Sequence, residues 1–428
     1  METETIKVEK SGPGGCPVLH GLNLVGDEAV NRPGAYTALA RREAPVFFVP
    51  ETGFFVATRH ADVERVLTDH EYFEPILPPA VVPEEARDLL PDGFVYQRSG
   101  ALTAESPPSH TRIRKLAQKG FTRGAVESWR EPTERICQGL VDEFADKGEA
   151  ELIDAYTRRF PILVMAAVLQ IDAGEAPQLY DWALDIFRLF GDPAIPHEEL
   201  FAICRRQAEF ENWALGLITE RRRAPRGEGD IVSSLITAVD NEGTSRLSDE
   251  EIFSVIVAMI AGGADTSSAS AAQMTRRILS DPDLQRRVLA EPGFLSVLME
   301  EDLRHDFVGR IAFRQVSPKG AELSGVSLPP GAIIGAHIWS ANHDEEAFSD
   351  PDHFDPDRGD VKNLLSWGKK THFCLGAPLA RLEVPIAVRT LFERLPNLEL
   401  VSGHEIERMP AFFLPNVVGG LFVTWDRG

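Results

Sequence analysis

The chain has 428 residues, 43% of them hydrophobic, and its 66 acidic and 44 basic side chains give a net charge of −22. A chain of this length and composition buries a large core. The acidic excess argues against nucleic acid as a partner, because phosphate binding needs a basic face. The four cysteines are scattered and form no C-x-x-C pair, so neither a disulfide framework nor a cysteine-rich zinc site is predicted, and a reducing cytosol fits.

The amino terminus, Met1 to Lys7, contains no apolar segment of signal-peptide length. No uninterrupted apolar run of about 18 residues occurs elsewhere in the sequence. We therefore expect a cytoplasmic protein that does not use a membrane as a partner. No linker divides the chain, and no internal repeat is found.

The periodicity predicts mostly helix with a few strand pairs. Residues 46–49 and 54–58 flank Glu51-Thr52-Gly53, which is a hairpin signal. Helical patterns follow from His60, from Ser109, and over 125–146, 158–169 and 200–222. A second strand-rich segment covers 310–339, around a turn at Leu328 to Gly331. Strands and helices do not alternate regularly, so we predict a mainly α fold with a small β-rich region rather than a doubly wound sheet.

The longest predicted helix has an unusual centre. Ser248 and Glu251 form a capping box, and from Ile252 the helical pattern continues to Leu279, about 40 Å. Within it lies Gly262-Gly263-Ala264-Asp265-Thr266. Two adjacent glycines cost roughly 1 kcal/mol each, and a buried acid beside a hydroxyl is unfavourable. One interpretation is close helix packing with Asp265 facing solvent; the other is a local opening for a diatomic ligand, with hydroxyl and carboxylate guiding protons.

The most specific segment is Ser366 to Gly376, where Cys374 stands between glycines and is followed by a helical pattern. A thiolate can be an axial ligand of haem iron and favours O–O cleavage there. Gly368 and Gly376 allow a tight loop, and a helix beginning near Pro378 would favour the thiolate. The alternative interpretation is that Cys374 is only a small apolar side chain buried in a loop.

This segment resembles the haem-binding loop of the cytochrome P450 monooxygenases. In that family an aromatic residue and a glycine stand seven and six residues before the cysteine, a histidine two before, and a glycine two after. The matching residues are Trp367, Gly368, His372, Cys374 and Gly376. Two positions depart from the pattern: Trp367 replaces the usual phenylalanine, and Lys370 stands where a second glycine is usual.

The resemblance extends to the centre of the long helix. Gly262 to Thr266 matches the family's distal motif of small residue, glycine, any residue, acid and threonine, about 110 residues before Cys374. It implies that Asp265 and Thr266 are the catalytic residues that deliver protons to bound dioxygen.

A further match is Glu301 and Arg304, which are three residues apart and share a helix face. Alone, this is a common surface pair. In the resembled family the E-x-x-R unit binds an arginine from the segment before the haem loop, which implies Arg358 here. We expect these three residues to form a structural network that holds the cysteine loop.

Buried haem propionates need cationic or donor partners. The resemblance implies His110 with Arg114, Arg314, and His372. The alternative for His110 and Arg114 is that they form an ordinary exposed pair. Arg310 is the alternative to Arg314 as the propionate-binding arginine after the E-x-x-R helix.

The resemblance covers the chain from about Pro33, which predicts an extension over 1–32 and one haem-enclosing P450 domain over 33–428. It implies haem b and a monooxygenase that inserts one atom of dioxygen into a small apolar substrate by hydroxylation, dealkylation or epoxidation. The chain contains no flavin or ferredoxin domain, so electrons are expected from a separate ferredoxin or flavodoxin with its reductase. The alternatives are oxidative coupling, a peroxide-driven peroxygenase, and a haem sensor or carrier without catalytic activity.

The resemblance also indicates a substrate pocket with aromatic and apolar walls, suited to a flat or terpenoid-sized molecule. Its candidate residues are Val257, Ile260, Ala261, Arg310, Phe313, Phe412 and Phe413. Arg310 has three competing interpretations: it binds a propionate, pairs with a protein acid, or anchors a substrate carboxylate. A cationic patch for an acidic ferredoxin is expected from Arg114, Lys369, Lys370 and Arg381.

Overall fold

A computed structural model describes residues 6–24, 26–77, 82–90, 93–94, 102–191, 195–227, 229–240, 243–291, 293–408 and 417–427. The chain forms two compact units. The first unit contains residues 1–78, 300–374 and 408–415, and the second contains 79–299, 375–407 and 416–428.

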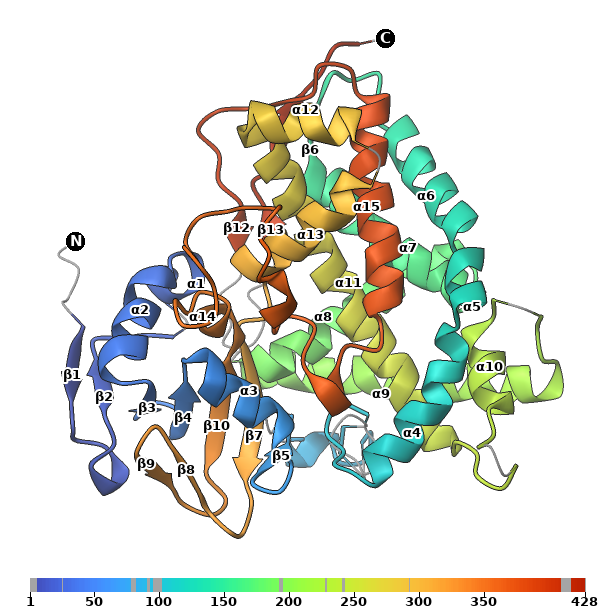
Figure 1. The fold of residues 1–428 in the computed structure, drawn as a ribbon. Coiled ribbons are helices and arrows are strands. Elements are labelled where there is room, and N and C mark those ends of the chain that lie inside the picture. The colour runs from blue at the N-terminus through green and yellow to red at the C-terminus, as the bar shows by residue number, and fades with distance from the viewer. Residues whose placement is uncertain are drawn as a thin grey trace. The chain divides into compact units, whose positions relative to one another are not determined.

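The first unit is built on a seven-stranded sheet with the order β1-β2-β3-β4-β10-β7-β5. Figure 1 shows its amino-terminal strands in blue and the later ones in orange. The strands are β1 (Lys7–Glu9), β2 (Val18–His20), β3 (Val46–Val49), β4 (Phe54–Ala57), β5 (Phe73–Pro75), β7 (Ile311–Val316) and β10 (Ile333–His337). β10 pairs with β4 in parallel and with β7 antiparallel, so it joins the two sequence-distant parts of the sheet.

Both faces of this sheet are buried, which explains why β4 is apolar at every position. Phe55 and Ala57 point into a core that includes α3 (His60–Thr68), whereas Phe54 and Val56 point into a core that includes α2 (Gly34–Glu43). Side chains alternate along a strand, so a strand covered on both sides loses the usual alternation of apolar and polar residues.

Shorter elements complete the first unit. They are α1 (Asp27–Asn31), α14 (Ile338–Ala341), the hairpin β8 (Ala321–Leu323) with β9 (Val326–Leu328), and the 3₁₀ turns η1 (Pro13–Gly15), η7 (Val361–Asn363) and η8 (Lys370–His372). Helix α13 (Phe294–His305) begins in the second unit and ends in the first.

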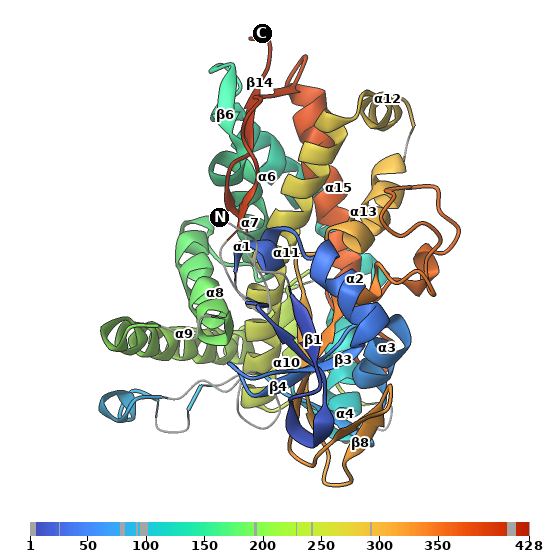
Figure 2. The same cartoon turned by 90° about the vertical axis from the view of Figure 1, so that its left-hand side faces the viewer.

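The second unit is helical. Its helices are α4 (Ser109–Ala117), α5 (Arg123–Ser128), α6 (Arg130–Asp142), α7 (Arg159–Val168), α8 (Ala176–Gly191), α9 (His197–Arg223), α10 (Ile231–Thr237), α11 (Asp249–Ser280), α12 (Pro282–Ala290) and α15 (Ala377–Arg394). Helix α11 is central, because it packs against α7, α8, α9 and α15. Figure 2 shows α8 and α9 beside the yellow α11.

Helix α11 begins with the predicted capping box, in which Ser248 and Glu251 exchange side-chain to backbone hydrogen bonds. Among the described helices, it is the one whose length and hydropathy would suffice to cross a membrane. However, 72% of its most apolar 18-residue window is buried in the fold. Its hydrophobicity is that of a core helix surrounded by other helices.

Small strand pairs and 3₁₀ turns complete the second unit. A three-stranded sheet joins β11 (Glu399–Leu400), β14 (Phe422–Thr424) and β6 (Glu149–Glu151). β12 (Glu407–Arg408), which begins in this unit, pairs with β13 (Val417–Gly419). The turns are η2 (Glu84–Ala86), η4 (Gln118–Phe121) and η6 (Ala173–Glu175).

The mainly α fold with a small β region is confirmed, as is the hairpin β3–β4. The single helix predicted over 125–146 is wrong: the chain forms α5 and α6, separated at Trp129. A π-helical turn (Ile153–Thr157) precedes α7 and was not predicted. The expected extension over 1–32 contributes β1 and β2 to the sheet, although its short strands carry no clear alternation.

Candidate active site

The cysteine loop, in the first unit, folds back on itself. The Cys374 backbone N–H donates to the Trp367 carbonyl at 2.6 Å, and the Gly368 N–H donates to the Leu365 carbonyl at 2.8 Å. Gly368 has φ +70°, and a Cβ there would lie 2.7 Å from the His372 carbonyl oxygen. The loop therefore requires glycine at position 368 for both its conformation and its close approach.

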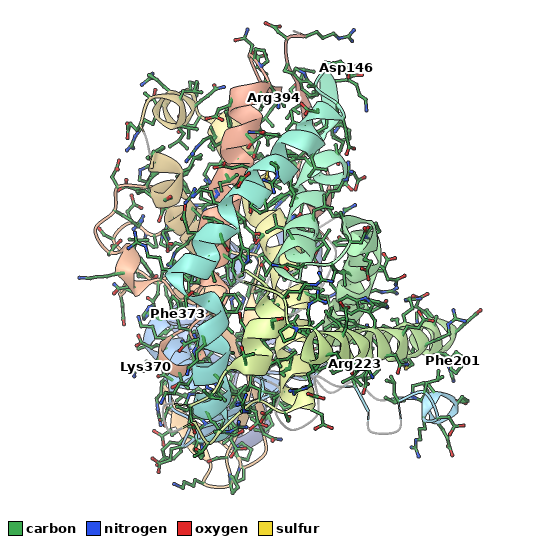
Figure 3. All side chains as sticks on the ribbon, turned by 90° about the vertical axis from the view of Figure 1, so that its right-hand side faces the viewer. Asp146, Phe201, Arg223, Lys370, Phe373 and Arg394 are labelled. Atoms are coloured by element: carbon green, nitrogen blue, oxygen red, sulfur yellow. The ribbon has the colours of Figure 1, made fainter. Side chains whose placement is uncertain are left out.

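Lys370 stands where the resembled family usually has glycine, and its φ is +48°. This is the left-handed region, which costs an L-residue roughly 1–2 kcal/mol. The lysine thus keeps the loop conformation that glycine would adopt more easily. Figure 3 labels Lys370 and Phe373 on this loop, and both are exposed.

The second departure from the family pattern, Trp367, has a specific partner. Its indole Nε1–H donates to the Glu300 carboxylate at 2.9 Å. A phenylalanine has no such donor, so the tryptophan adds a hydrogen bond between the loop and α13.

Cys374 differs from the other three cysteines of the chain. Burial raises the pKa of Cys16 and Cys204 to about 11 and of Cys137 to about 12, so these side chains are neutral thiols near pH 7. Cys374 is exposed and lies just before α15, whose first turn contains Pro378. A helix amino terminus favours a thiolate. Gly376, the N-cap of α15, has φ −79°, a conformation open to any residue.

Glu301, Arg304 and Arg358 come together as a buried network in the first unit. Arg304 donates from Nε and Nη2 to the two Glu301 carboxylate oxygens, at 2.7 and 2.8 Å. Arg358 Nε lies 2.9 Å from the same carboxylate. Glu301 and Arg304 are fully buried, so the interpretation as a common surface pair is wrong for them.

This network fixes the segment that leads to the cysteine loop. The remaining N–H groups of Arg304 donate to the carbonyls of Asn342, Pro351 and His353 at 2.7 to 3.1 Å. The Asn342 side chain in turn holds Ser366 and the Leu365 N–H, at 2.8 and 3.0 Å. All five guanidinium donors of Arg304 are therefore used to position backbone.

Arg314, on β7, is suited to a haem propionate. It is 7% exposed, and among the described residues its Nε has no hydrogen-bond partner. Burial lowers its pKa to about 10, so it is still a cation near neutral pH. A buried cation without a carboxylate needs an anion. The residues present thus fit a haem whose propionate would pair with Arg314.

His70 lies in the same group and was missed by the sequence reasoning. Its ring centre is 5.1 Å from that of His372, and burial together with the charge of Arg314 lowers its pKa. Both ring nitrogens are buried without a hydrogen-bond partner among the described residues. No motif marks this histidine, because it stands in the turn after α3 and comes close to Arg314 only in the fold.

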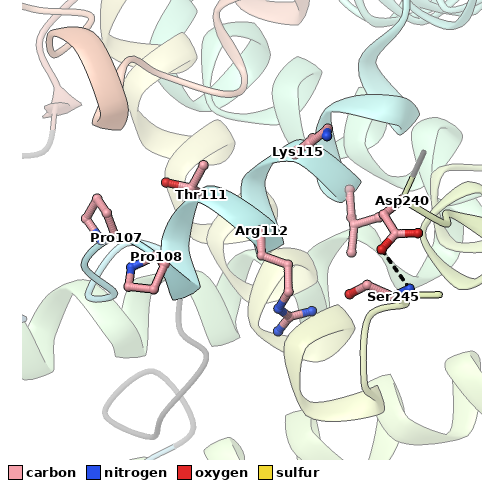
Figure 4. Close-up of a pocket in the computed structure, with 8 residues that line it drawn as sticks. Pro107, Pro108, Thr111, Arg112, Lys115, Asp240 and Ser245 are labelled. Carbon is pink, nitrogen blue, oxygen red and sulfur yellow. Dashed lines mark hydrogen bonds between the residues drawn. The ribbon is translucent and has the colours of Figure 1, made fainter. Parts of the chain in front are cut away.

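His110 and Arg114 lie on α4, in the second unit. His110 is 1% exposed, so the interpretation as an ordinary exposed pair is wrong for it. A cavity of about 700 Å³ opens on a different face of the helix, beside Thr111, Arg112 and Lys115 (Figure 4). Neither His110 nor Arg114 lines that cavity.

The centre of α11 combines close packing with open space. A Cβ on Gly263 would lie 3.0 Å from the Met165 methyl group of α7, whereas a Cβ on Gly262 would meet nothing within 4 Å. The helix is continuous here, so the expected local opening does not interrupt it. The Thr266 hydroxyl donates to the Gly262 carbonyl at 2.6 Å. Its lone pairs are left to accept another hydrogen bond.

Asp265 is 5% exposed, so the interpretation in which it faces solvent is wrong. Tyr180 of α8 donates to it at 3.4 Å. Burial raises the pKa of Asp265 to about 6, although Tyr180 and the charge of Arg158 act in the opposite direction. An acid with this pKa exchanges protons readily near neutral pH.

Glu383 of α15 is a second buried acid, which the sequence reasoning missed. Ser267, two residues after Asp265, donates to it at 2.6 Å. Burial raises the pKa of Glu383 to about 8. The available signal was an acid within the apolar run Leu382 to Ile386 of a helix.

The predicted pocket residues fall into separate groups. Val257, Ile260 and Ala261 are buried on α11 in the second unit. Phe313, in the first unit, packs against Phe54 with ring centres 5.2 Å apart, so it belongs to the core between the sheet and α2 rather than to a pocket wall. Phe412 and Phe413 lie outside the described residues.

Comparison with known proteins decides the family. The model of the family described as "Cytochrome P450" matches residues 34–416. The chain belongs to the cytochrome P450 family. This P450 is 31% identical to epothilone C/D epoxidase of Sorangium cellulosum, over 87% of this chain and 88% of that protein. It is 33% identical to the monooxygenase PikC of Streptomyces venezuelae, over 75% of each chain.

Solved structures agree with this assignment. CYP109Q5 from Chondromyces apiculatus has a TM-score of 0.80 and 27% identity, covering 95% of this chain and 99% of that one. CYP109E1 from Bacillus megaterium, in complex with corticosterone, has a TM-score of 0.78 and 25% identity, covering 92% and 98%. This P450 therefore has a haem-thiolate cofactor and is a monooxygenase that acts with dioxygen on a small organic substrate.

The strained backbone at Lys370 gives a first test. We expect Lys370→Val to lower the stability of the haem-loaded protein by about 1 kcal/mol, because a β-branched residue is particularly unfavourable in the left-handed region. The matched control is Lys369→Val, which removes the same charge at an extended position with φ −142°. Thermal midpoints of the three proteins provide the measurement. Equal losses in both variants would contradict the conformational explanation.

The buried acid Glu383 gives a second test. A carboxyl whose pKa is about 8 in the folded protein and about 4.5 when unfolded stabilises the fold at low pH. This stabilisation decreases by roughly 1 kcal/mol per pH unit as the pH rises from the unfolded to the folded pKa, and it is fully lost above about pH 8. Asp265 also has a raised pKa, of about 6, so its own pH-dependent stabilisation of the fold has already been lost at pH 6.5.

We therefore expect the thermal midpoint to fall between pH 6.5 and 8 in the parent and to change much less in Glu383→Gln. Glu393→Gln, an exposed change on the same helix, should keep the slope of the parent. A slope unaffected by Glu383→Gln would show that this carboxyl is ionised across the range.

Proposed function

We propose that Cys374 is the axial thiolate ligand of haem b in this P450, and that the enzyme oxidises a small, largely apolar substrate by hydroxylation, dealkylation or epoxidation. The observation that carries the proposal is the contrast among the cysteines: three are buried with a raised pKa, and Cys374 alone is exposed, before α15. When bound, the haem would supply redox chemistry in which two electrons and two protons convert dioxygen into one inserted oxygen atom and water.

The protein side chains would bind the haem and control protons. Arg314 and His372 would pair with propionates in the first unit, and His110 and Arg114 would do so from α4. Charge-assisted hydrogen bonds of this kind are short and strong when buried. Glu301, Arg304 and Arg358 would act as a positioning network, because they hold the backbone before the cysteine loop and not the haem itself.

Asp265 and Thr266 would deliver protons. Asp265 has a pKa of about 6, set mainly by burial, so it can lose and regain a proton within one turnover near pH 7. Thr266 directs its own hydrogen to the Gly262 carbonyl, which leaves the hydroxyl oxygen to accept a hydrogen bond from a water that would carry the proton. Tyr180 orients the Asp265 carboxylate from α8.

We expect Asp265→Asn to slow turnover by about 10² to 10⁴-fold while substrate binding changes little, because the amide cannot transfer the proton. Thr266→Ala should instead divert electrons to hydrogen peroxide. The measurements are product formation, NADH consumption and peroxide release. A matched control is Thr275→Ala, since Thr275 makes the same hydrogen bond to Ala271 further along α11, at 2.7 Å. Full rate and coupling in both active-site variants would refute these roles.

Electrons would come from a separate ferredoxin or flavodoxin with its reductase, and the location would be cytoplasmic. The redox-partner proposal is supported by the exposed Lys370, which follows Lys369 on the cysteine loop, and by the exposed Arg381 of α15. Arg114 of α4, which is partly buried, is a further candidate. An acidic protein such as this one, with a net charge of −22, needs a local cationic site to attract an acidic ferredoxin.

The rate of reduction by an acidic ferredoxin should fall as ionic strength rises, because salt screens the docking charges. The double variant Lys369→Ala/Lys370→Ala should be reduced more slowly at low salt and should depend less on salt. Stopped-flow reduction under carbon monoxide would measure this. A double variant that matched the parent at every salt concentration would exclude these lysines.

A further inference from the structure

Arg310 is a buried cation with no ion-pair partner in the part of the chain that the structure describes. The described residues include six buried arginines, Arg41, Arg221, Arg304, Arg310, Arg314 and Arg358. Four of them pair with carboxylates: Glu345, Asp230, Glu301 and, for Arg358, Glu301 and Asp360. Arg314 fits a haem propionate. Arg310 is the remaining one, and no acid among the described residues forms an ion pair with it, which argues against the interpretation that it pairs with a protein acid.

The contacts of Arg310 leave most of its donors unused. Its Nη2 donates to the Val30 carbonyl at a long 3.3 Å, and its Cζ lies 5.5 Å from the centre of the Trp339 ring. Nε and Nη1 have no hydrogen-bond partner among the described residues. Burial and the charge of Arg408 lower its pKa to about 10, and Asp306 acts in the opposite direction without forming an ion pair with it.

Two neighbouring side chains also have unused donors. The indole Nε1–H of Trp339 is buried and has no acceptor in the described part of the chain. The second is Tyr36 of α2, whose hydroxyl lies 2.6 Å from His337 Nε2. Burial raises the pKa of Tyr36, while the charge of Arg310 acts to lower it, so the two groups are close enough to interact.

The protonation of His337 determines which way the Tyr36 hydrogen bond runs. The Ser340 backbone N–H donates to His337 Nδ1 at 3.1 Å, so Nδ1 carries no hydrogen. Burial and Arg310 lower the pKa of His337 to about 3, which makes the ring neutral with its hydrogen on Nε2. Nε2–H therefore donates to the Tyr36 oxygen. The Tyr36 hydroxyl hydrogen is then left to donate elsewhere.

Arg310, Trp339 and Tyr36 thus hold four buried donor groups that find no acceptor among the described residues of the first unit. Natural proteins rarely leave several such groups together, because each costs about 1 to 3 kcal/mol. We propose that these three side chains form a carboxylate-binding site and that its ligand is the acid end of an otherwise apolar carboxylic acid, the substrate of this P450.

The chemistry favours a carboxylate over a phosphate. One guanidinium with two neutral donors matches a single negative charge, and a planar fork of N–H groups binds a carboxylate through two parallel hydrogen bonds. The otherwise apolar body of the acid follows from the largely apolar substrate proposed for the enzyme. A haem propionate offers the same chemistry as a free acid, but the neighbours of Arg310 include Val30, Trp339 and Tyr36, whereas Arg314 is the arginine beside His70. The identification of the acid as the substrate rests on the proposed function. The existence of a carboxylate-binding site does not depend on it.

The test is calorimetric titration of the haem-loaded enzyme with dodecanoic acid and with its methyl ester. We expect the parent to bind the acid about 10- to 100-fold more tightly than the ester, which is the effect of a hydrogen-bonded charge. Arg310→Leu should bind both equally and keep its haem. Arg42→Leu, an exposed change on α2, is the matched control and should behave as the parent.

Two further variants keep the site testable if Arg310→Leu does not fold. Arg310→Lys keeps the charge but loses the fork, and Tyr36→Phe removes one donor; each should weaken acid binding and leave ester binding unchanged. Equal binding of acid and ester by the parent would overturn the site and assign the donors to buried water. Haem loss in Arg310→Leu would assign Arg310 to a propionate.

A separate readout tests the substrate identity. The acid should move the parent haem from low to high spin, as a substrate does. Tight acid binding without this shift would overturn the identification of the acid as substrate. A shift without product formation would instead count against the proton-delivery roles of Asp265 and Thr266, so the two proposals can fail separately.

Discussion

The buried carboxylate of Glu301 is the interaction on which the cysteine loop depends. It accepts hydrogen bonds from Arg304 and the Asp355 N–H and is paired with Arg358. These two arginines donate to the carbonyls of five residues from Asn342 to His353. Removing one member of a buried ion pair typically costs about 3 to 5 kcal/mol, because the remaining charge stays buried. The irregular segment before Cys374 contains little regular structure, so this network replaces the backbone ladder that would otherwise fix its shape.

The same principle, that a buried charge needs a partner, separates structural from functional residues in this P450. Arg304 and Arg221 are fully buried and have carboxylates beside them, which identifies them as structural. Arg314 and Arg310 are buried and form no ion pair with a carboxylate of the described residues, which is why we propose that a ligand supplies each anion. Asp265 and Glu383 are acids that burial holds partly or largely protonated near neutral pH. Buried acids with raised pKa values are suited to proton transfer.

The sequence was sufficient for the features that depend on local spacing. The hairpin at Glu51-Thr52-Gly53, the capping box of α11 and the cysteine segment are each encoded within a few residues. Trp129 did not stand out as a break between α5 and α6, because no glycine or proline marks it. The role of Lys370 could not be derived, because a positive φ at a lysine is imposed by the loop around it and not by the residue.

The features that were missed depend on distant parts of the chain. His70 meets His372 across 302 positions of sequence, and Ser267 meets Glu383 across 116. Phe313 alternates with Ala312 and Arg314 along β7, and the side of the sheet that it faces is known only once β10 and β4 are paired. Periodicity identifies the two faces of such a strand, but it does not show which helices or other elements pack against each face.

The most direct test of Cys374 as the haem ligand is the absorption spectrum of the ferrous carbonyl complex in Cys374→His, compared with the parent and with Cys16→Ser. Thiolate ligation gives this complex a characteristic Soret band, because sulfur donates electron density to iron. We predict that the band is present in the parent and in Cys16→Ser and lost in Cys374→His. A thiolate-type band that persisted in Cys374→His would contradict it.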